Sequence, residues 1–199
     1  MPAIRHATPA DADAVCRIYN PHVTDTIVSF EEAPVAAADM AARITDLSRT
    51  HPWYVYEESG AVIGYAYASP WRTRAAYRDA VESTVYVERG LVGSGIGSKL
   101  YGALIPELRR RSFHCVMGGI ALPNPSSIAL HESLGFRKVA HFEQVGYKQD
   151  RWVDAKTQQP RSRLKVLARE VKFVGPKPED EAKAEDAEAE TPERETSEA

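Results

Sequence analysis

The stretch from Val81 to Leu100 (VESTVYVERGLVGSGIGSKL) places the strongest constraint on how this chain can fold. It begins as a strand, because β-branched and aromatic residues dominate its first third. It then passes into a helix through glycines at alternate positions, Gly93, Gly95 and Gly97. Such a turn presents free backbone N–H groups at the positive end of the helix dipole. The stretch therefore predicts a site for a phosphate or pyrophosphate, with the carboxylate of Glu82 on the strand that leads to it.

The composition fits one folded domain followed by an acidic tail. A chain of 199 residues with 43% hydrophobic residues is long enough to bury a core. Residues 176–199 carry ten acidic and three basic side chains and hold no aromatic residue, Val, Ile or Leu. Such a segment cannot bury enough apolar surface to offset its chain entropy. We predict a folded domain over residues 1–174 and a disordered, solubilising tail over 175–199.

Charge, hydropathy and cysteine content exclude several classes of protein. The net charge of −3 includes −7 from residues 176–199, so the remainder carries +4, too little to indicate a nucleic-acid partner. We expect no membrane span, because no apolar run approaches about 20 residues, and no signal peptide, because the N-terminus has no apolar core behind a basic start. Only two cysteines occur, Cys16 and Cys115, and no His, Cys and Asp residues show metal-ligand spacing. These features predict a cytoplasmic protein without a metal.

Periodicity and turn residues predict strands and helices on both sides of the central stretch. Upstream we expect strands at residues 4–6, 53–56 and 61–68, extended chain at 26–30, and helices from Thr8 or Asp11 to Asn20-Pro21 and over 35–47. Downstream we expect helices at 95–111 and 126–134, a strand at 114–121, and a hairpin of 139–142 with 146–148. This order indicates an α/β (α+β) fold, a mixed, mostly antiparallel sheet with helices on both faces.

Several short motifs occur in register along the domain. They are YAYASPW, ESTVYV, GSGIGS, NPS and HESLGF, at Tyr65–Trp71, Glu82–Val87, Gly93–Ser98, Asn124–Ser126 and His131–Phe136. One glycine-rich turn is a weak signal by itself, whereas several motifs in order are a strong one. Together they resemble the GNAT superfamily of N-acetyltransferases, and within it the phosphinothricin N-acetyltransferase family, over roughly residues 4–154.

The resemblance implies acetyl-CoA as donor and an amine as acceptor. Backbone groups would hold the pantetheine arm at Val85, Tyr86 and Val87, and the pyrophosphate at Gly93, Ser94, Gly95, Ile96, Gly97 and Ser98. Asn124 would contact the far side of the arm. The superfamily usually begins this turn with Gln or Arg, and Val92 stands there instead, so we expect weaker CoA affinity at most. The glycines could alternatively serve only the packing of strand against helix.

Two side chains are candidates for the chemistry. The amine must lose a proton, and Glu82 is placed to accept it as a general base. Without the resemblance, a solvated strand-edge Glu is the simpler interpretation of Glu82. In many relatives a Tyr occupies the position of His131, which could protonate the leaving thiolate, act as a second base, or be a structural His satisfied by Asn124 or water. The charge that develops on the thioester oxygen would be stabilised by a backbone N–H near Thr84 and Val85.

The acceptor would be held just before the central strand. The resemblance matches Arg72, Arg74 and Tyr77 to positions that receive acidic groups of the substrate, and Arg suits bidentate binding of a carboxylate or phosphinate. The alternative is two solvated loop arginines. Phe30 and Trp71 could line this pocket or belong to the core.

The sequence thus predicts a homodimeric N-acetyltransferase for a small amino-acid-like acid such as phosphinothricin, methionine sulfoximine or methionine sulfone. Transfer would be direct, without an acyl-enzyme. An N-acetyltransferase for another small amine or a protein N-terminus, or a non-catalytic acyl-CoA-binding sensor, are the alternatives. The match weakens after Asp154, where we expect a closing strand that is short or at the sheet edge, followed by an additional segment at 161–174.

Overall fold

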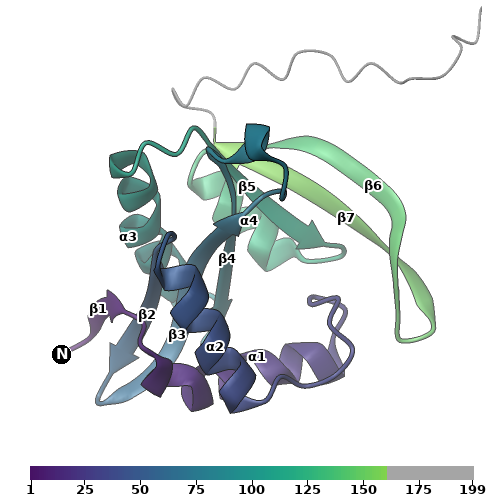
Figure 1. The fold of residues 1–199 in the computed structure, drawn as a ribbon. Coiled ribbons are helices and arrows are strands. Elements are labelled where there is room, and N and C mark those ends of the chain that lie inside the picture. Colours follow the sequence, from purple (N-terminus) through teal and green to yellow (C-terminus); the bar gives the residue numbers. More distant parts are fainter. Residues whose placement is uncertain (161–199) are drawn as a thin grey trace, which may run out of the picture. The chain divides into compact units, whose positions relative to one another are not determined.

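In the computed structural model, residues 1–160 are described, and they form a sheet with helices on both faces (Figure 1). The strands are β1 (Ala3–His6), β2 (Trp53–Glu58), β3 (Ala61–Pro70), β4 (Ala80–Val87), β5 (Cys115–Ala121), β6 (Phe136–Lys148) and β7 (Arg151–Pro160). The helices are α1 (Ala12–Asp25), α2 (Ala37–Ser48), α3 (Ile96–Arg110) and α4 (Pro125–Ser133), with short 3₁₀ turns at Pro9–Asp11 and Ala75–Tyr77. Within these residues no helix combines the length and apolarity needed to cross a membrane.

The seven strands lie in the order β1-β2-β3-β4-β5-β7-β6. Every neighbouring pair is antiparallel except β4 and β5, which run parallel. A parallel pair needs a crossover, and α3 supplies it. The predicted mixed, mostly antiparallel sheet with helices on both faces is confirmed.

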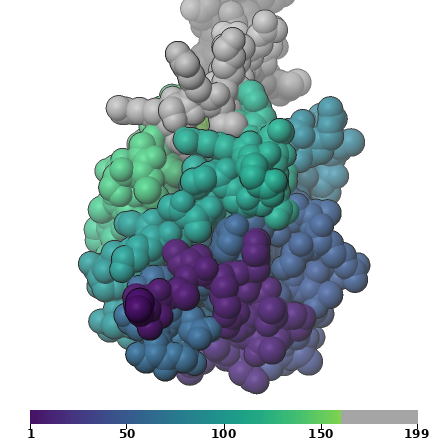
Figure 2. Space-filling model, turned by 90° about the vertical axis from the view of Figure 1, so that its left-hand side faces the viewer, coloured from purple at the N-terminus to yellow at the C-terminus, as the bar shows by residue number. Residues whose placement is uncertain are grey.

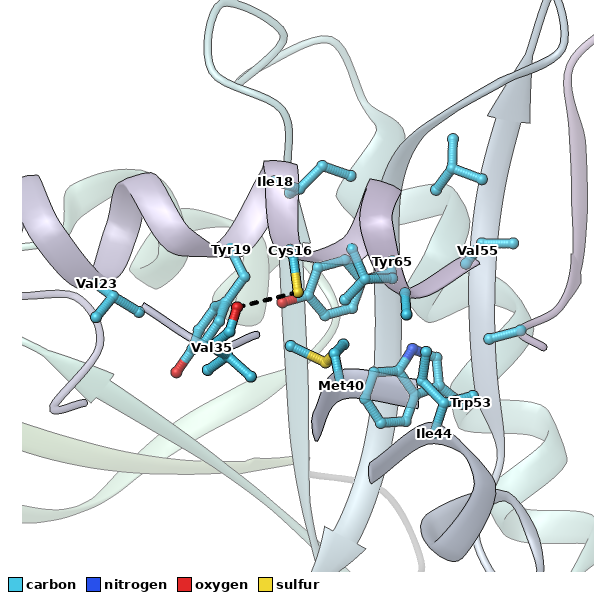
Figure 3. Close-up of a cluster of buried hydrophobic side chains, with 14 residues drawn as sticks. Cys16, Ile18, Tyr19, Val23, Val35, Met40, Ile44, Trp53, Val55 and Tyr65 are labelled. Atoms are coloured by element: carbon cyan, nitrogen blue, oxygen red, sulfur yellow. Dashed lines mark hydrogen bonds between the residues drawn. The ribbon is translucent and has the colours of Figure 1, made fainter. Parts of the chain in front are cut away.

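Alternate residues of β3 face two separate cores, as the pleat of a strand requires. Tyr65 faces the first core, which α1 and α2 cover and which Figure 3 shows in close-up. There the Trp53 and Tyr67 rings stack at 4.1 Å, and the Cys16 thiol donates to the Val35 carbonyl at 3.4 Å. Ala66 faces the second core, which α3 covers with side chains such as those of Leu100, Leu104 and Leu108.

Besides its backbone pairing with β2, the N-terminal strand is held in place by the side chain of one arginine. Figure 2 shows this segment, in purple, packed against blue and teal segments from the middle of the chain. Arg5 donates to both carboxylate oxygens of Asp11, at 2.7 and 2.9 Å, and to Glu57 on β2 at 2.8 Å. Asp11 also accepts from the backbone N–H of Thr8 at 2.7 Å, so one buried carboxylate joins β1 to the start of α1.

Two expectations about the N-terminal half are wrong. Helix α1 does not end at Asn20-Pro21 but continues to Asp25, because Val23 is buried in the first core and Thr24 and Thr26 hydroxyls bond helix carbonyls. Residues 26–30 are a bent loop and not extended chain. Side-chain contacts hold this loop, since the Tyr19 and Ser29 hydroxyls lie 2.7 Å apart and Lys148 donates to the Ser29 carbonyl at 2.6 Å.

The C-terminal expectations also need correction. Residues 139–142 and 146–148 are one strand, β6, which pairs with β7 across the tight turn Gln149-Asp150. Both turn residues have positive φ, a requirement that Gln rarely signals in a sequence. The closing strand is neither short nor at the edge, because β7 has ten residues and lies between β5 and β6. The predicted segment 161–174 and the acidic tail lie outside the described residues.

The Arg5–Asp11 contact predicts a pH-dependent change in stability. The Arg5 guanidinium lowers the pKa of Asp11 below its usual value, so this contribution is present above the unfolded pKa and is lost as pH falls through the folded pKa. Asp11→Asn should lower the free energy of unfolding by about 1–3 kcal/mol at pH 7. Urea denaturation at pH 7 and at pH 3 measures it. An equal loss at both pH values would contradict the assignment to the charged pair.

Candidate active site

A cleft of about 1140 Å³ opens where β4 separates from β5. The two strands pair only from Ala80 opposite Cys115 to Glu82 opposite Met117, although both continue further. Beyond that point the β4 edge that faces away from β3 has no strand partner among residues 1–160. The cleft is lined by this free edge, residues 83–87, and by residues 119–121 of β5.

The free edge of β4 presents backbone groups to the cleft, because its side chains alternate between the two faces of the sheet. Val85 packs towards α3 in the second core, whereas the Tyr86 ring lies on the other face, 5.1 Å from the ring of Tyr19. Antiparallel pairing with β3 occupies only one edge of β4. The N–H and C=O groups on the second edge are therefore available to an extended ligand, in the way that a sheet edge accepts an added strand.

The glycine-rich turn lies at one end of the same cleft. Gly93 and Gly95 have φ of 89° and 84°, in the left-handed region that favours glycine. Gly95 is the N-cap of α3, and no side chain caps the first turn of this helix. The N–H groups of that turn, which a helix cannot satisfy internally, therefore form an anion site with the helix dipole. Val92 in this turn is 57% exposed.

The third glycine of the motif has a packing role. A Cβ at Gly97 would lie 3.0 Å from Leu130 Cδ2 of α4, so α3 and α4 approach each other at this position. Gly97 is therefore needed for close packing, as the alternative interpretation of the glycine motif expected, although the packing partner is helix α4. Gly93 and Gly95 have no such close neighbour, since a Cβ there would meet nothing within 4 Å.

The Glu82 carboxylate lies in the cleft above Gly119 of β5. A Cβ on Gly119 would lie 2.5 Å from Glu82 Oε1, so this carboxylate occupies the space of the missing side chain. Because β4 is an interior strand, Glu82 is not a solvated residue of a sheet edge. Burial raises the pKa of Glu82 above its usual value, and the positive charge of Arg72 partly opposes that rise.

His131 lies on the other side of β5, above Gly118. It is buried, and a Cβ on Gly118 would lie 2.6 Å from its Nε2. Nδ1 contacts the Ser127 carbonyl at 2.7 Å, and Nε2 contacts the Tyr101 hydroxyl at 3.2 Å. Burial lowers the pKa of His131 below its usual value. The His131 ring is therefore held by Ser127 and Tyr101, and not by Asn124 as one of the sequence-based alternatives proposed.

Asn124 caps the start of α4 at the rim of the cleft. Its Oδ1 accepts a hydrogen bond from the Ser127 backbone N–H at 3.1 Å. This bond is the usual role of Asn at an N-cap, and it fixes the direction of α4 and so the place of His131 one turn later.

The structure separates the residues predicted to bind the acceptor. Phe30, Trp71 and Arg72 line the cleft, with the Arg72 guanidinium 4.6 Å from the centre of the Trp71 ring. Arg74 and Tyr77 lie in or next to the 3₁₀ turn Ala75–Tyr77, are exposed, and do not line the cleft. The Phe30 ring packs closely over Gly146 of β6, where a Cβ would lie 2.6 Å from it.

Sequence reasoning missed other side chains of the cleft. Tyr101 of α3 and Lys156 of β7 both line it, as do Tyr67 and Glu31. Neither Tyr101 nor Lys156 lies in a recognisable motif, and Tyr101 follows the helical period of the core. The one available signal was the pair Gly118-Gly119, two residues without side chains inside a strand, which marks a close approach on both faces. In the part of the chain that the structure describes, no three His, Cys, Asp or Glu residues gather as metal ligands would.

Comparison of the sequence with known proteins identifies the family of this chain. A family model described as an acetyltransferase (GNAT) domain matches residues 4–156. Phosphinothricin N-acetyltransferase of Streptomyces viridochromogenes is 40% identical over 151 residues, which cover 76% of this chain and 82% of that relative. The L-methionine sulfoximine/L-methionine sulfone acetyltransferase of Salmonella typhimurium is 40% identical over 152 residues, covering 76% and 89%.

A solved structure agrees in fold. The phosphinothricin acetyltransferase of the GNAT superfamily from Sinorhizobium meliloti, solved in complex with AcCoA, matches with a TM-score of 0.76 and 37% identity over 79% of this chain and 86% of that one. The family model spans most of the chain, and the open edge of β4 and the glycine turn lie inside the matched residues. The chain therefore belongs to the GNAT acetyltransferase family, together with the phosphinothricin N-acetyltransferases.

Proposed function

We propose that this protein transfers the acetyl group of acetyl-CoA to the α-amino group of a small amino-acid-like acid. Relatives named for phosphinothricin and for methionine sulfoximine and sulfone support this acceptor class, so these three compounds are the first to test. The observation that carries the proposal is the position of Glu82. Its half-buried carboxylate lies in the cleft beside the last paired residues of β4, at the point where the free backbone edge begins.

The described residues fit acetyl-CoA as the donor. The free edge of β4 at Val85, Tyr86 and Val87 suits the amide-bearing pantetheine arm, and the uncapped start of α3 suits its pyrophosphate. When bound, acetyl-CoA supplies a thioester carbon that an uncharged amine can attack. The protein's contribution is to align the amine, remove its proton and stabilise the charge that develops on the thioester oxygen.

Glu82 is the proposed general base. Burial raises its pKa towards the operating pH, which makes it a better proton acceptor than a solvated carboxylate. Direct transfer is supported by the positions of the two thiols. Cys16 and Cys115 are both buried and neither lines the cleft, so no cysteine nucleophile is available there to carry an acyl group.

His131 is proposed to act as a proton acceptor. Burial lowers its pKa and so favours the neutral ring, whose free nitrogen has a lone pair that can accept a proton, although as a weaker base than a solvated imidazole. It lies on the opposite side of β5 from Glu82. The two groups therefore reach the cleft from different faces of the sheet.

Arg72 is proposed to bind the acidic group of the acceptor. It is the arginine of the predicted set that lines the cleft, and its charge acts on Glu82. A guanidinium can bind a carboxylate or phosphinate through two parallel hydrogen bonds. A substrate held in this way would present its amino group between Arg72 and Glu82.

A homodimer and a cytoplasmic location are further parts of the proposal. Several apolar side chains along the β6–β7 hairpin are exposed, namely Val139, Phe142, Val145, Tyr147 and Trp152, of which Phe142 and Val145 also line the cleft. The Tyr147 and Trp152 rings pair edge to face at 5.2 Å while 55% and 60% exposed, which fits a surface that a second copy covers. The two free thiols fit a reducing compartment.

Removing the proposed base should depress turnover. Glu82→Gln keeps the size of the side chain and should lower kcat by about 10²-fold or more. Because the pKa of Glu82 lies above its usual value, kcat/KM of the wild type should fall as pH drops through that pKa, and the variant should lose this limb. Thiol release from acetyl-CoA measures both. Glu58→Gln, an exposed change on β2, is the matched control, and near-normal turnover of Glu82→Gln would remove Glu82 from the mechanism.

Removing the proposed anion contact should weaken acceptor binding. Arg72→Gln should raise KM for phosphinothricin by roughly 10-fold or more, since a charge-assisted hydrogen bond is lost, and leave KM for acetyl-CoA little changed. It should also move the acidic limb of kcat/KM to higher pH, because Arg72 opposes the rise in the pKa of Glu82.

The same saturation curves test the two other arginines nearby. Arg78→Gln is the matched control, since Arg78 is exposed and faces Asp79. Arg74→Gln tests the sequence-based expectation directly. A larger effect at Arg74 than at Arg72 would contradict the acceptor position that the cleft geometry supports.

The proposed dimer surface has a separate test. Trp152→Ser should shift the protein from dimer to monomer in sedimentation velocity at micromolar concentration, because the largest exposed ring of the hairpin is removed. His114→Ser, at the exposed turn before β5, is the control. A wild-type protein that sediments as a monomer at all concentrations would rule out the homodimer.

A further inference from the structure

Three side chains form a hydrogen-bonded chain that ends on His131. The Tyr101 hydroxyl lies 3.2 Å from His131 Nε2 and 3.3 Å from Ser83 Oγ, and Ser83 donates to the Met117 carbonyl at 3.2 Å. Tyr101 is fully buried in α3, between β4 and α4. At the other end of the ring, Nδ1 lies 2.7 Å from the Ser127 carbonyl. Both ring nitrogens of His131 are thus held by protein groups.

The hydrogens on this chain can be assigned from the acceptors. A carbonyl only accepts, so the ring must carry its hydrogen on Nδ1 to bond Ser127. In the neutral ring, Nε2 is then an acceptor, and its donor is the Tyr101 hydroxyl. Ser83 donates its own hydrogen to the Met117 carbonyl, so its oxygen can only accept from Tyr101. In this state the single hydroxyl hydrogen of Tyr101 is therefore shared between two acceptors, Ser83 Oγ and His131 Nε2.

A protonated ring removes this competition. Nε2–H then donates to the Tyr101 oxygen, Tyr101 donates to Ser83, and Ser83 donates to the Met117 carbonyl. Every donor of the chain has an acceptor, and all bonds run in one direction. Nε2 gains one proton, whose bond to its donor breaks, and the Tyr101 hydroxyl hydrogen rotates towards Ser83, while no covalent bond within the three side chains breaks.

We propose that Tyr101 is a positioning residue for His131, which fixes the neutral ring with its hydrogen on Nδ1 and reverses its own hydrogen bond when Nε2 takes a proton. The effect on turnover rests on the proposed function, in which that proton comes from the acceptor's ammonium group. The tautomer of the ring does not rest on it. The missing side chain at Gly118 is what lets Nε2 reach this position.

No other group around the His131 ring, within the described residues, is placed to accept a hydrogen bond from Nε2–H. Phe136 of β6 packs edge-on at 5.0 Å and offers no polar atom. Lys156 of β7 acts on the ring through its positive charge, which disfavours protonation, as does burial. Glu82 of β4 lies on the opposite side of β5, where it faces Gly119. Ser127 holds Nδ1 in both states. Tyr101 is therefore the group whose removal should change how Nε2 binds a proton.

The test is ¹⁵N NMR of the imidazole in protein labelled at histidine. In the wild type at pH 7.5, we expect the His131 signals of a neutral ring with hydrogen on Nδ1. Tyr101→Phe keeps the ring in the core but removes the hydroxyl, so the Nε2 resonance should move to that of a free lone pair. The pKa of His131 should also fall by roughly one pH unit, because a bond to the charged form is worth more than one to the neutral form.

A second variant keeps the test valid if Tyr101→Phe folds poorly. Ser83→Ala removes the acceptor of the Tyr101 hydrogen, so the tyrosine should donate to Nε2 alone and the pKa of His131 should again fall. Tyr56→Phe is the matched control, since the Tyr56 hydroxyl on β2 accepts from Lys99 at 3.3 Å and takes no part in the chain that ends on His131. His131 in the tautomer with hydrogen on Nε2, or an unchanged titration in both variants, would overturn the proposal.

The activity profile separates this proposal from the proposed function. If His131 accepts a proton during turnover, its limb in the kcat/KM profile should move to lower pH in Tyr101→Phe, together with the NMR titration. Should the titration move while the profile stays fixed, Tyr101 positions the ring as proposed, and it is the catalytic part of His131 in the proposed function that fails.

Discussion

The separation of β4 from β5 after Glu82 and Met117 is the constraint on which the site depends. An intact parallel pair would satisfy the backbone groups of residues 83–87 and leave no room between the strands. Because pairing stops, one edge of β4 is free, the cleft forms, and the glycine turn at its end can start a helix that points its N–H groups inwards. The strand that carries the proposed base is thus the same strand that offers the backbone edge.

The two glycines of β5 determine how side chains enter this opening. Successive residues of a strand face opposite sides of the sheet, so the absence of side chains at Gly118 and Gly119 leaves one open position on each face. His131 fills the first and Glu82 fills the second. Their surroundings then shift the two pKa values in opposite directions, since burial disfavours the charged form of each group and the charged forms have opposite signs.

Much of this could be predicted from the sequence, because the relevant signals are local. The strand–turn–helix at 81–100, the sheet with helices on both faces, and the position of Glu82 follow from residue pattern and motif. The misses have physical causes. Pro21 reads as a helix end, but tertiary packing of Val23 carries α1 past it. The β6–β7 turn uses Gln149 and Asp150 at positive φ, where Gly or Asn would have been visible in the sequence.

Within the site, sequence reasoning found groups that belong to motifs and missed groups that distant segments bring together. Tyr101 reads as a core residue of α3, and only the fold shows that its hydroxyl meets a ring from α4. Arg74 and Arg72 look equivalent in the chain, whereas the loop directs one to the cleft and leaves the other outside. Two residues that are neighbours in sequence need not share a surface.

The place of β7 in the sheet has a consequence for the order in which the domain can be completed during synthesis. β5 lies beside β4 on one side and needs β7 on the other, and β7 is the last strand of the described chain. Until residues 151–160 have left the ribosome, one edge of β5 has no partner, and the cleft lacks Lys156 and Thr157 on its wall. An exposed strand edge favours association with other chains. The nascent chain therefore keeps this edge of β5 unpaired until β7 has emerged, whereas the residues of the glycine turn leave the ribosome much earlier.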